Sequence, residues 1–323
     1  MGLIQANIHP LLGALESACG HKVIAYFLDE QGAIADEQVF HLYEHLRRLG
    51  KQDVLCLWIH SRGGATEVPW KMVSLLREFS DHISVLVPYR ALSAATQIAL
   101  GADEIVMTEM GELGPVDPSR RHPLLPREEV RTGERKPIPI SVQDLRHVLK
   151  FLEREIGKDK LTPEAAATVY TALFEKVHPL AIGALEQSWA LAQQVSEGLL
   201  LTHMKGDGAA ERVKAIVDRL SDHYKSHLYQ IGRREAREMG LPVRDATAAE
   251  AHAMWELYLG YMNVQIVGEG MADKEPILLR RLGHIDSTCA ITTGMELVRK
   301  SDGESIGARW ASRWLVAPAV PQP

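Results

Sequence analysis

Short apolar runs alternate with helical periodicities over the first third of the chain. The runs have the apolar character of strands buried on both faces, and they span 23–28, 54–59, 83–87 and 104–107. Between them apolar residues recur every three or four positions, which predicts helices over 39–49, 68–79 and 92–100. Asp36 and Thr66 precede the first two helices and suit N-cap positions. This alternation predicts right-handed βαβ units around a mainly parallel sheet.

The remainder of the chain has a different pattern. Residues 111–139 are dense in Gly, Pro and charge, which predicts a loop or an irregular hairpin. Helical periodicity dominates 142–220, and further helices are expected over 235–239 and 246–262. The last sixty or so residues mix short apolar runs with turn residues and predict no definite elements.

A length of 323 residues exceeds that of a usual single domain. We expect an N-terminal helical segment over 1–20 and an α/β core over 21–243. A C-terminal extension, made of a helix and a mixed segment, is expected over 244–323.

The charge balance and the apolar segments restrict the possible partners. The chain carries 36 basic and 42 acidic residues, a net charge of -6, so no nucleic-acid partner is expected. The start of the chain lacks a basic region followed by an apolar one, and no stretch of about 18 apolar residues occurs. We therefore expect a cytoplasmic protein without a membrane segment.

Two glycines directly follow the second predicted strand. Gly63-Gly64 would open the next helix and present free N–H groups at the C-terminal edge of the sheet, where an oxyanion can bind. Ser93 follows the third strand, so both features are expected at the same edge. A glycine pair also suits a tight turn, and a serine also suits an N-cap. Their pairing favours a nucleophile that faces an oxyanion hole.

Several separated segments occur together in a recognisable order. They read IHSRGG at 59–64, VPYRALSAAT at 87–96, ADEIVM at 102–107 and LGPVDP at 113–118, followed by SH at 226–227 and EAREMGL at 235–241. Together they resemble the serine dehydrogenase proteinase family, which is related to the Clp protease, signal peptide peptidase A and the crotonases. The resemblance covers roughly 23–243.

This resemblance implies a fold and a reaction. The expected fold class is α/β, a Clp-protease/crotonase-like ββα superhelix with additional C-terminal helices. Ser93 would attack a peptide carbonyl, and the oxyanion hole would be formed at Gly63, Gly64 and Ala94, with the N–H groups of Gly64 and Ala94 as donors. An acyl-enzyme would then be hydrolysed, as in a serine endopeptidase.

The chain departs from the family pattern at three places. Arg62 stands where the family has Pro before Gly-Gly, and Ala94-Ala95 stand where it has Gly-Gly. The His that Clp subunits carry on the strand after the nucleophile helix is absent from 104–116. Two other residues are candidates for the general base. Lys136 resembles the base of signal peptide peptidases, and His227 stands where the proteinase family carries a His.

The segment HLYEH at 41–45 matches the HxxEH pattern of zinc proteases. His41, Glu44 and His45 share one helical face, which is also what a solvated face looks like, and no third ligand is evident. We therefore expect no metal and no cofactor.

Two other function classes are open from the sequence. One is a crotonase-like acyl-CoA enzyme, although no adenine-binding pattern is seen. The other is a catalytically degenerate, ring-forming adaptor, which Arg62 and Ala94 would suit. A serine peptidase that acts on peptides or unfolded protein, and that assembles as a homo-oligomer through the helices after Val142, is the leading expectation.

Overall fold

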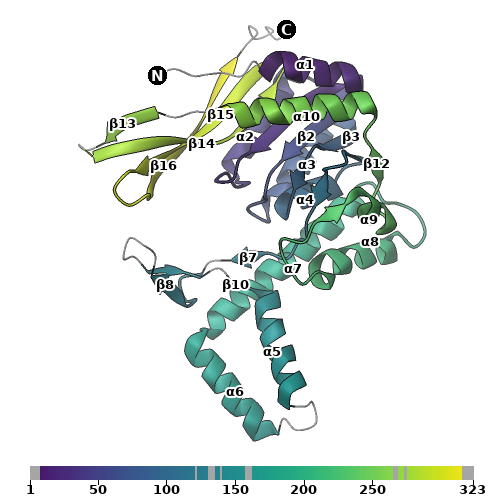
Figure 1. The fold of residues 1–323 in the computed structure, drawn as a ribbon. Coiled ribbons are helices and arrows are strands. Elements are labelled where there is room, and N and C mark those ends of the chain that lie inside the picture. The colour runs from purple at the N-terminus through teal and green to yellow at the C-terminus, as the bar shows by residue number, and fades with distance from the viewer. Residues whose placement is uncertain are drawn as a thin grey trace.

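A long twisted sheet forms the centre of the protein (Figure 1). The computed structural model describes residues 8–120, 122–129, 135–138, 140–156, 162–264, 268–272 and 275–314. The strand order is β12-β5-β3-β2-β1-β14-β15-β16, with β13 paired to β14. Five of these strands pair in parallel: β1 (Lys22–Leu28), β2 (Gln52–His60), β3 (Ser80–Val87), β5 (Glu104–Met107) and β12 (Val243–Asp245).

The predicted βαβ units are present in this parallel part. Helices α2 (Glu37–Leu49), α3 (Val68–Phe79) and α4 (Ala94–Leu100) connect successive strands and pack on one face of the sheet. Helices α1 (Ile8–Cys19) and α10 (Ala248–Asn263) pack together on the other face (Figure 1). The α/β fold class expected from the sequence is confirmed.

The predicted caps of two helices differ in outcome. Asp36 stands at the N-cap position of α2 as predicted, but its side chain makes no capping hydrogen bond and instead pairs with Lys71. Helix α3 has Glu67, not Thr66, at its N-cap position, and Glu67 makes no capping bond either. Pro at the start of α3 removes one N–H that a cap would otherwise satisfy, which reduces the need for one.

A small second sheet lies against the carboxyl ends of the parallel strands. It consists of β4 (Arg90–Ala91), β6 (Glu112–Leu113) and β11 (Ile231–Gly232), in the order β11-β6-β4. The predicted irregular region after Gly111 contains two short pairs besides β6. They are β7 (Ser119–Arg120) with β10 (Ile140–Ser141), and β8 (Arg127–Glu129) with β9 (Arg135–Pro137).

Helices make up most of the chain between β10 and β12. They are α5 (Val142–Ile156), α6 (Pro163–Lys176), α7 (Pro179–Leu201), α8 (Ala209–Asp218), the π-helical turn η1 (Arg219–His223) and α9 (Arg233–Glu238). Helix α7 packs against α3, α4 and α8, whereas α5 and α6 project away from the sheet (Figure 1). Within the described residues, no helix is both long and apolar enough to cross a membrane.

The C-terminal residues extend the central sheet instead of adding only helices. After α10 come β13 (Gly268–Ala272), β14 (Glu275–Ser287), β15 (Ala290–Arg299) and β16 (Ser305–Trp314). Strand β14 pairs antiparallel with β1, so the end of the chain lies beside its beginning. The division at residues 20 and 243 remains a prediction, although this pairing joins the C-terminal part to the core.

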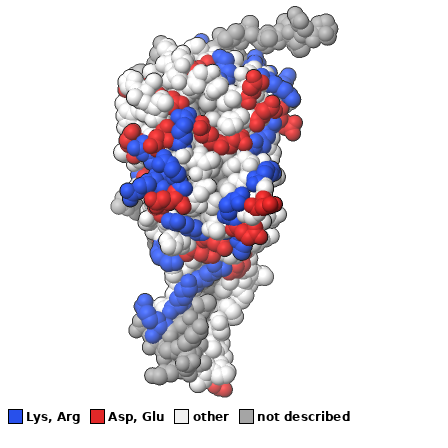
Figure 2. Space-filling model, turned by 90° about the vertical axis from the view of Figure 1, so that its right-hand side faces the viewer, with Lys and Arg blue, Asp and Glu red and all other residues white. Residues whose placement is uncertain are grey.

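Basic and acidic side chains are intermixed on the face that Figure 2 shows. Many charged residues form ion pairs, and those around α9 and β12 include Arg237 with Asp245 and Arg244 with both Glu104 and Glu250. Charges neutralised in this way do not make a continuous basic surface on this face for a phosphate backbone.

Candidate active site

The turn at Gly63-Gly64, here named the glycine turn, lies at the same edge of the sheet as Ser93. Strands β2 and β3 are parallel neighbours, so the segments that follow them leave the sheet at the same edge. A parallel bridge between Ser61 and Ala91 then holds the two segments together. In it the N–H of Ser61 donates to the carbonyl of Arg90 at 2.9 Å, and the N–H of Leu92 donates to the carbonyl of Ser61 at 3.0 Å.

Ser93 has an unusual backbone conformation. Its φ of 53° and ψ of -116° make it the one non-glycine residue with positive φ in the part of the chain that the structure describes. Ser93 stands at the N-cap position of α4, but its side chain makes no capping hydrogen bond. Such a conformation costs about 1 to 3 kcal/mol and is found mainly at functional sites.

Gly63 is required by its contact with Ser93. A Cβ atom placed on Gly63 would lie 2.7 Å from the Cβ of Ser93 and 2.8 Å from the carbonyl oxygen of Leu92. Its φ of 106° also disfavours any other residue. The N–H of Gly63 donates to the Oγ of Ser61 at 3.0 Å, so this N–H is already engaged. Gly63 therefore provides close approach, and the oxyanion donors must be its neighbours.

Gly64 and Ala94 carry the two candidate donor groups. A parallel bridge with Ile34 uses the carbonyl of Gly63 and the N–H of Ala65, so the N–H of Gly64 faces away from Ile34. Among the described residues, neither the Gly64 N–H nor the Ala94 N–H has a hydrogen-bond acceptor. Both lie beside Ser93, where two donors can bind one oxyanion.

The side chains at the departures from the family pattern make contacts of their own. The guanidinium of Arg62 pairs with the carboxylate of Glu30. The side chains of Ala94 and Ala95 are buried and form part of the hydrophobic core.

The small sheet brings a histidine and a carboxylate to the same place. Strands β4 and β6 run parallel, and beyond them the chain continues to Ser93 and to Asp117. Strand β11 is antiparallel to β6, with Ile231 opposite Leu113. Continuing this register by four residues in each direction places His227 opposite Asp117. The Nδ1 atom of His227 lies 2.9 Å from the Oδ1 atom of Asp117.

Neighbouring charges affect the pKa of His227. The hydrogen bond that His227 makes to Asp117 raises the pKa of His227 above its ordinary value, against the opposing effects of burial and of the charge on Arg62. A pKa shifted by a specific charged partner is a common feature of groups that act in general acid–base catalysis.

The other candidate base is Lys136. Its backbone belongs to β9, opposite Glu128 in the β8–β9 hairpin, which pairs with neither sheet. The side chain of Lys136 lies outside the described features, so its role stays a prediction.

Asp117 was not singled out from the sequence as a site residue. It lies in the LGPVDP segment, four residues beyond the end of β6 at the active edge. An acidic residue at this place in the segment was the available signal, and the structure shows that its side chain is buried. Its partner is 110 residues away, so the pairing depends on the register of β6 with β11.

The HxxEH segment has a different role from a metal site. His45 is buried, and its two ring nitrogens contact the hydroxyl groups of Ser287 at 2.8 Å and of Thr292 at 2.9 Å. Burial lowers the pKa of His45 to about 4. His45 thus joins α2 to the C-terminal strands as a neutral packing residue.

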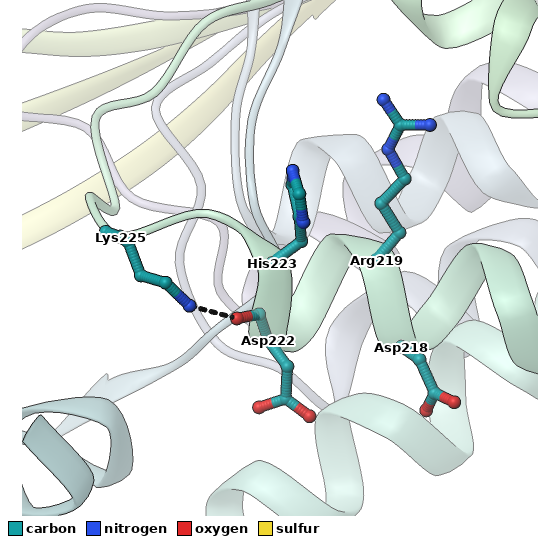
Figure 3. A pocket seen from close by; sticks show the side chains of 5 residues that line it. All are labelled: Asp218, Arg219, Asp222, His223 and Lys225. Atoms are coloured by element: carbon teal, nitrogen blue, oxygen red, sulfur yellow. Dashed lines mark hydrogen bonds between the residues drawn. The ribbon is translucent and has the colours of Figure 1, made fainter. Parts of the chain in front are cut away.

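A cavity of about 660 Å³ lies away from this edge, at the end of α8 (Figure 3). Its side chains come from one stretch of chain, Asp218 to Lys225, and carry opposite charges. Asp222 accepts hydrogen bonds from Gln143 and Arg146, and the Nζ of Lys225 donates to the Asp222 carbonyl. No described serine, threonine or cysteine lines this cavity, so it lacks a nucleophile.

Two curated relatives are similar to this chain. Both are uncharacterized proteins of Methanocaldococcus jannaschii. One is 26% identical over 213 residues, which cover 66% of this chain and 61% of the relative. The other is 29% identical over 154 residues, covering 43% of this chain and 52% of the relative. The chain thus spans less than two thirds of the length of either relative.

Solved structures show more distant similarity. A ClpP1 mutant from Listeria monocytogenes is 11% identical, with a TM-score of 0.38 and coverage of 75% of this chain and 97% of that one. A putative enoyl-CoA hydratase/isomerase from Novosphingobium aromaticivorans is 16% identical, with a TM-score of 0.23 and coverage of 58% and 82%. Neither similarity is high enough to carry an argument about activity.

A family model gives the more specific match. Residues 34–131 match the model of the ClpP-like SDH-type serine proteinases. This segment includes Gly63, Gly64, Ser93 and Asp117, whereas His227 lies beyond it. The resemblance predicted from the sequence is thereby confirmed over residues 34–131, the part of the α/β core that carries Ser93.

Proposed function

We propose that this protein is a serine peptidase that hydrolyses peptides or unfolded protein in the cytoplasm. The observation that carries the proposal is the convergence of three segments at one end of the small sheet. They bring the strained Ser93, the free N–H groups beside it and the Asp117-bound His227 to one edge.

The chemistry follows from the hydrogen bond between His227 and Asp117. Because the Nδ1 atom of His227 faces a carboxylate, it carries the proton and donates a hydrogen bond to Asp117. The Nε2 atom is then free to accept the proton of the Ser93 hydroxyl as its oxygen attacks the substrate carbonyl. The N–H groups of Gly64 and Ala94 stabilise the resulting oxyanion.

The reaction is completed in two steps. Protonated His227 gives its proton to the leaving amine, and an acyl-enzyme on Ser93 remains. His227 then removes a proton from water, which attacks the acyl-enzyme, and returns that proton to the Ser93 oxygen as the ester bond breaks and the acid product leaves. Asp117 does not react, but it fixes the tautomer of His227 and stabilises its protonated form.

A fluorophosphonate probe tests the nucleophile, because it reacts only with an activated serine. The wild-type protein should be labelled, and Ser93→Ala should not. Equal labelling of the two proteins would refute the proposed function.

The same labelling rate distinguishes the two candidate bases. His227→Ala should slow labelling by about 10² to 10⁴-fold, the usual contribution of a general base. Lys136→Ala should label at the wild-type rate. His223→Ala is the matched control, since His223 is an exposed histidine outside this site. A large loss in Lys136→Ala with a small one in His227→Ala would transfer the role of base to Lys136.

A further inference from the structure

A second cavity, of about 820 Å³, lies directly beside the proposed oxyanion hole. One wall is formed by residues 64–67, where the glycine turn leads into α3. The opposite wall is a single face of α7, with Gln187, Leu191 and Gln194 at helical spacing. Pro118, which directly follows Asp117, also lines the cavity. The cavity thus extends from the catalytic edge along α7.

Among the described residues that line this cavity, Glu67 is the one ionisable residue. Its side chain is exposed, makes no capping bond to α3, and has no ion pair within the described part of the chain. The nearest cation along α3, Lys71, is already held by Asp36. The carboxylate of Glu67 is therefore available to a ligand.

The other residues that line the cavity are neutral, and several have short side chains that leave room for a long substrate side chain. Gln187 and Gln194 offer amide oxygens, and Thr66 offers a hydroxyl group. Gly64, Ala33, Ala65 and Ala190 have short side chains or none. A long side chain with a cationic, hydrogen-bond-donating end fits this combination of a free carboxylate and amide oxygens.

We propose that this cavity is the specificity pocket of the peptidase and selects lysine or arginine at the residue whose carbonyl is attacked. The proposal rests on the proposed function, since Gly64 both lines the cavity and supplies an oxyanion donor. A substrate carbonyl bound at the Gly64 N–H places the side chain of that same residue beside the cavity. Glu67 then pairs with its cationic end.

Peptidyl diphenyl phosphonates that carry lysine, arginine, leucine or glutamate at the reacting residue test the pocket. The wild-type protein should react fastest with the lysine and arginine probes. In Glu67→Gln the ratio of lysine to leucine labelling rates should fall by about three- to tenfold, the range expected for a partly solvated ion pair. Glu67→Lys should favour the glutamate probe over the lysine probe.

Glu37→Gln is the matched control. Glu37 is also an exposed glutamate at the start of a helix, α2, and does not line the cavity. It should keep the wild-type ratio. Because Glu67 and Glu37 are both exposed, neither substitution should affect folding.

The outcomes separate this proposal from the one on which it rests. If neither a plain fluorophosphonate nor any peptidyl probe labels Ser93, the proposed function fails and the pocket fails with it. If the fluorophosphonate labels Ser93 but the probes show no preference for a cation, or Glu67→Gln keeps that preference, the pocket assignment is wrong and the peptidase assignment stands.

Discussion

Ser93, at the scale of single residues, combines a reactive position with a strained backbone. Its φ of 53° and ψ of -116° suit glycine far better than any residue with a Cβ atom. Ser93→Gly and Ser93→Ala both remove the hydroxyl group, but only the glycine variant relieves the strain. We expect Ser93→Gly to be more stable than Ser93→Ala by about 1 kcal/mol. Urea unfolding of the two variants measures this difference, and equal stabilities would mean that the turn is not strained.

Asp117 favours the protonated form of His227, so both activity and stability should depend on pH. A base must be neutral, so activity should fall as the pH drops through the raised pKa of His227. The stability that the His227–Asp117 pair contributes has the opposite dependence: it is present at low pH and is lost as the pH rises through that pKa. Catalysis and this contribution to stability therefore favour different pH ranges.

Asp117→Asn should lower the pKa of His227 because it removes the carboxylate charge and its hydrogen bond. The acidic limb of the pH–labelling profile should move to lower pH, while the maximal rate falls because the tautomer is no longer fixed. Fluorophosphonate labelling between pH 5 and 9 records both effects. An unchanged acidic limb would show that His227 does not control the profile.

At the scale of elements, the turn that follows β2 requires a residue without a side chain at Gly63. Gly63→Ala should place a methyl group against Ser93, where the Cβ distance is only 2.7 Å, and should abolish labelling and destabilise the protein by about 2 kcal/mol or more. Gly13→Ala is the matched control, because Gly13 lies inside α1 with open space around its Cβ position. That change should stabilise the protein by about 0.5 to 1 kcal/mol. Thermal unfolding together with labelling compares the two.

The elements also show what the sequence can and cannot predict. Strands β1, β2, β3 and β5, with the helices between them, agree with the predicted pattern because burial on both faces and helical periodicity are local signals. The strands after α10 were not predicted. Many positions of β14 and β15 are only half buried, which weakens the alternation, and the pairing of β14 with β1 joins distant parts of the chain.

The same limit applies to the site. Gly63 and Ser93 were predicted because each follows a strand, and parallel strands end at a common edge. The pairing of Asp117 with His227 was not predicted, since it depends on the β6–β11 register across 110 residues. The specificity pocket was missed as well, because α7 contributes one of its walls and no local pattern shows where α7 packs.

At the scale of the whole molecule, α5 and α6 form an arm that carries apolar side chains on its surface. Phe151, Tyr170 and Phe174 have exposed fractions of 51%, 46% and 46%, and α6 has no buried residue. Figure 1 shows this arm projecting away from the sheet. An exposed apolar surface of this kind is typical of a contact between subunits. The arm of a second copy of this chain is the partner that we expect there, which gives a homo-oligomer.

Replacing these aromatic residues by charges should separate the copies. The wild-type protein should have an oligomeric mass by light scattering, and Phe151→Glu combined with Phe174→Glu should shift it toward the monomer, because a buried carboxylate without a partner is strongly unfavourable in an apolar contact. Phe40→Glu is the control, since Phe40 is 63% exposed on α2, outside the arm, and should leave the mass unchanged. Circular dichroism should show the helical content intact in all three proteins, because the substituted side chains are not part of the core. A monomeric wild type, or an oligomer that survives both arm substitutions, would exclude the arm as the subunit contact and leave the proposed catalytic edge within each chain unaffected.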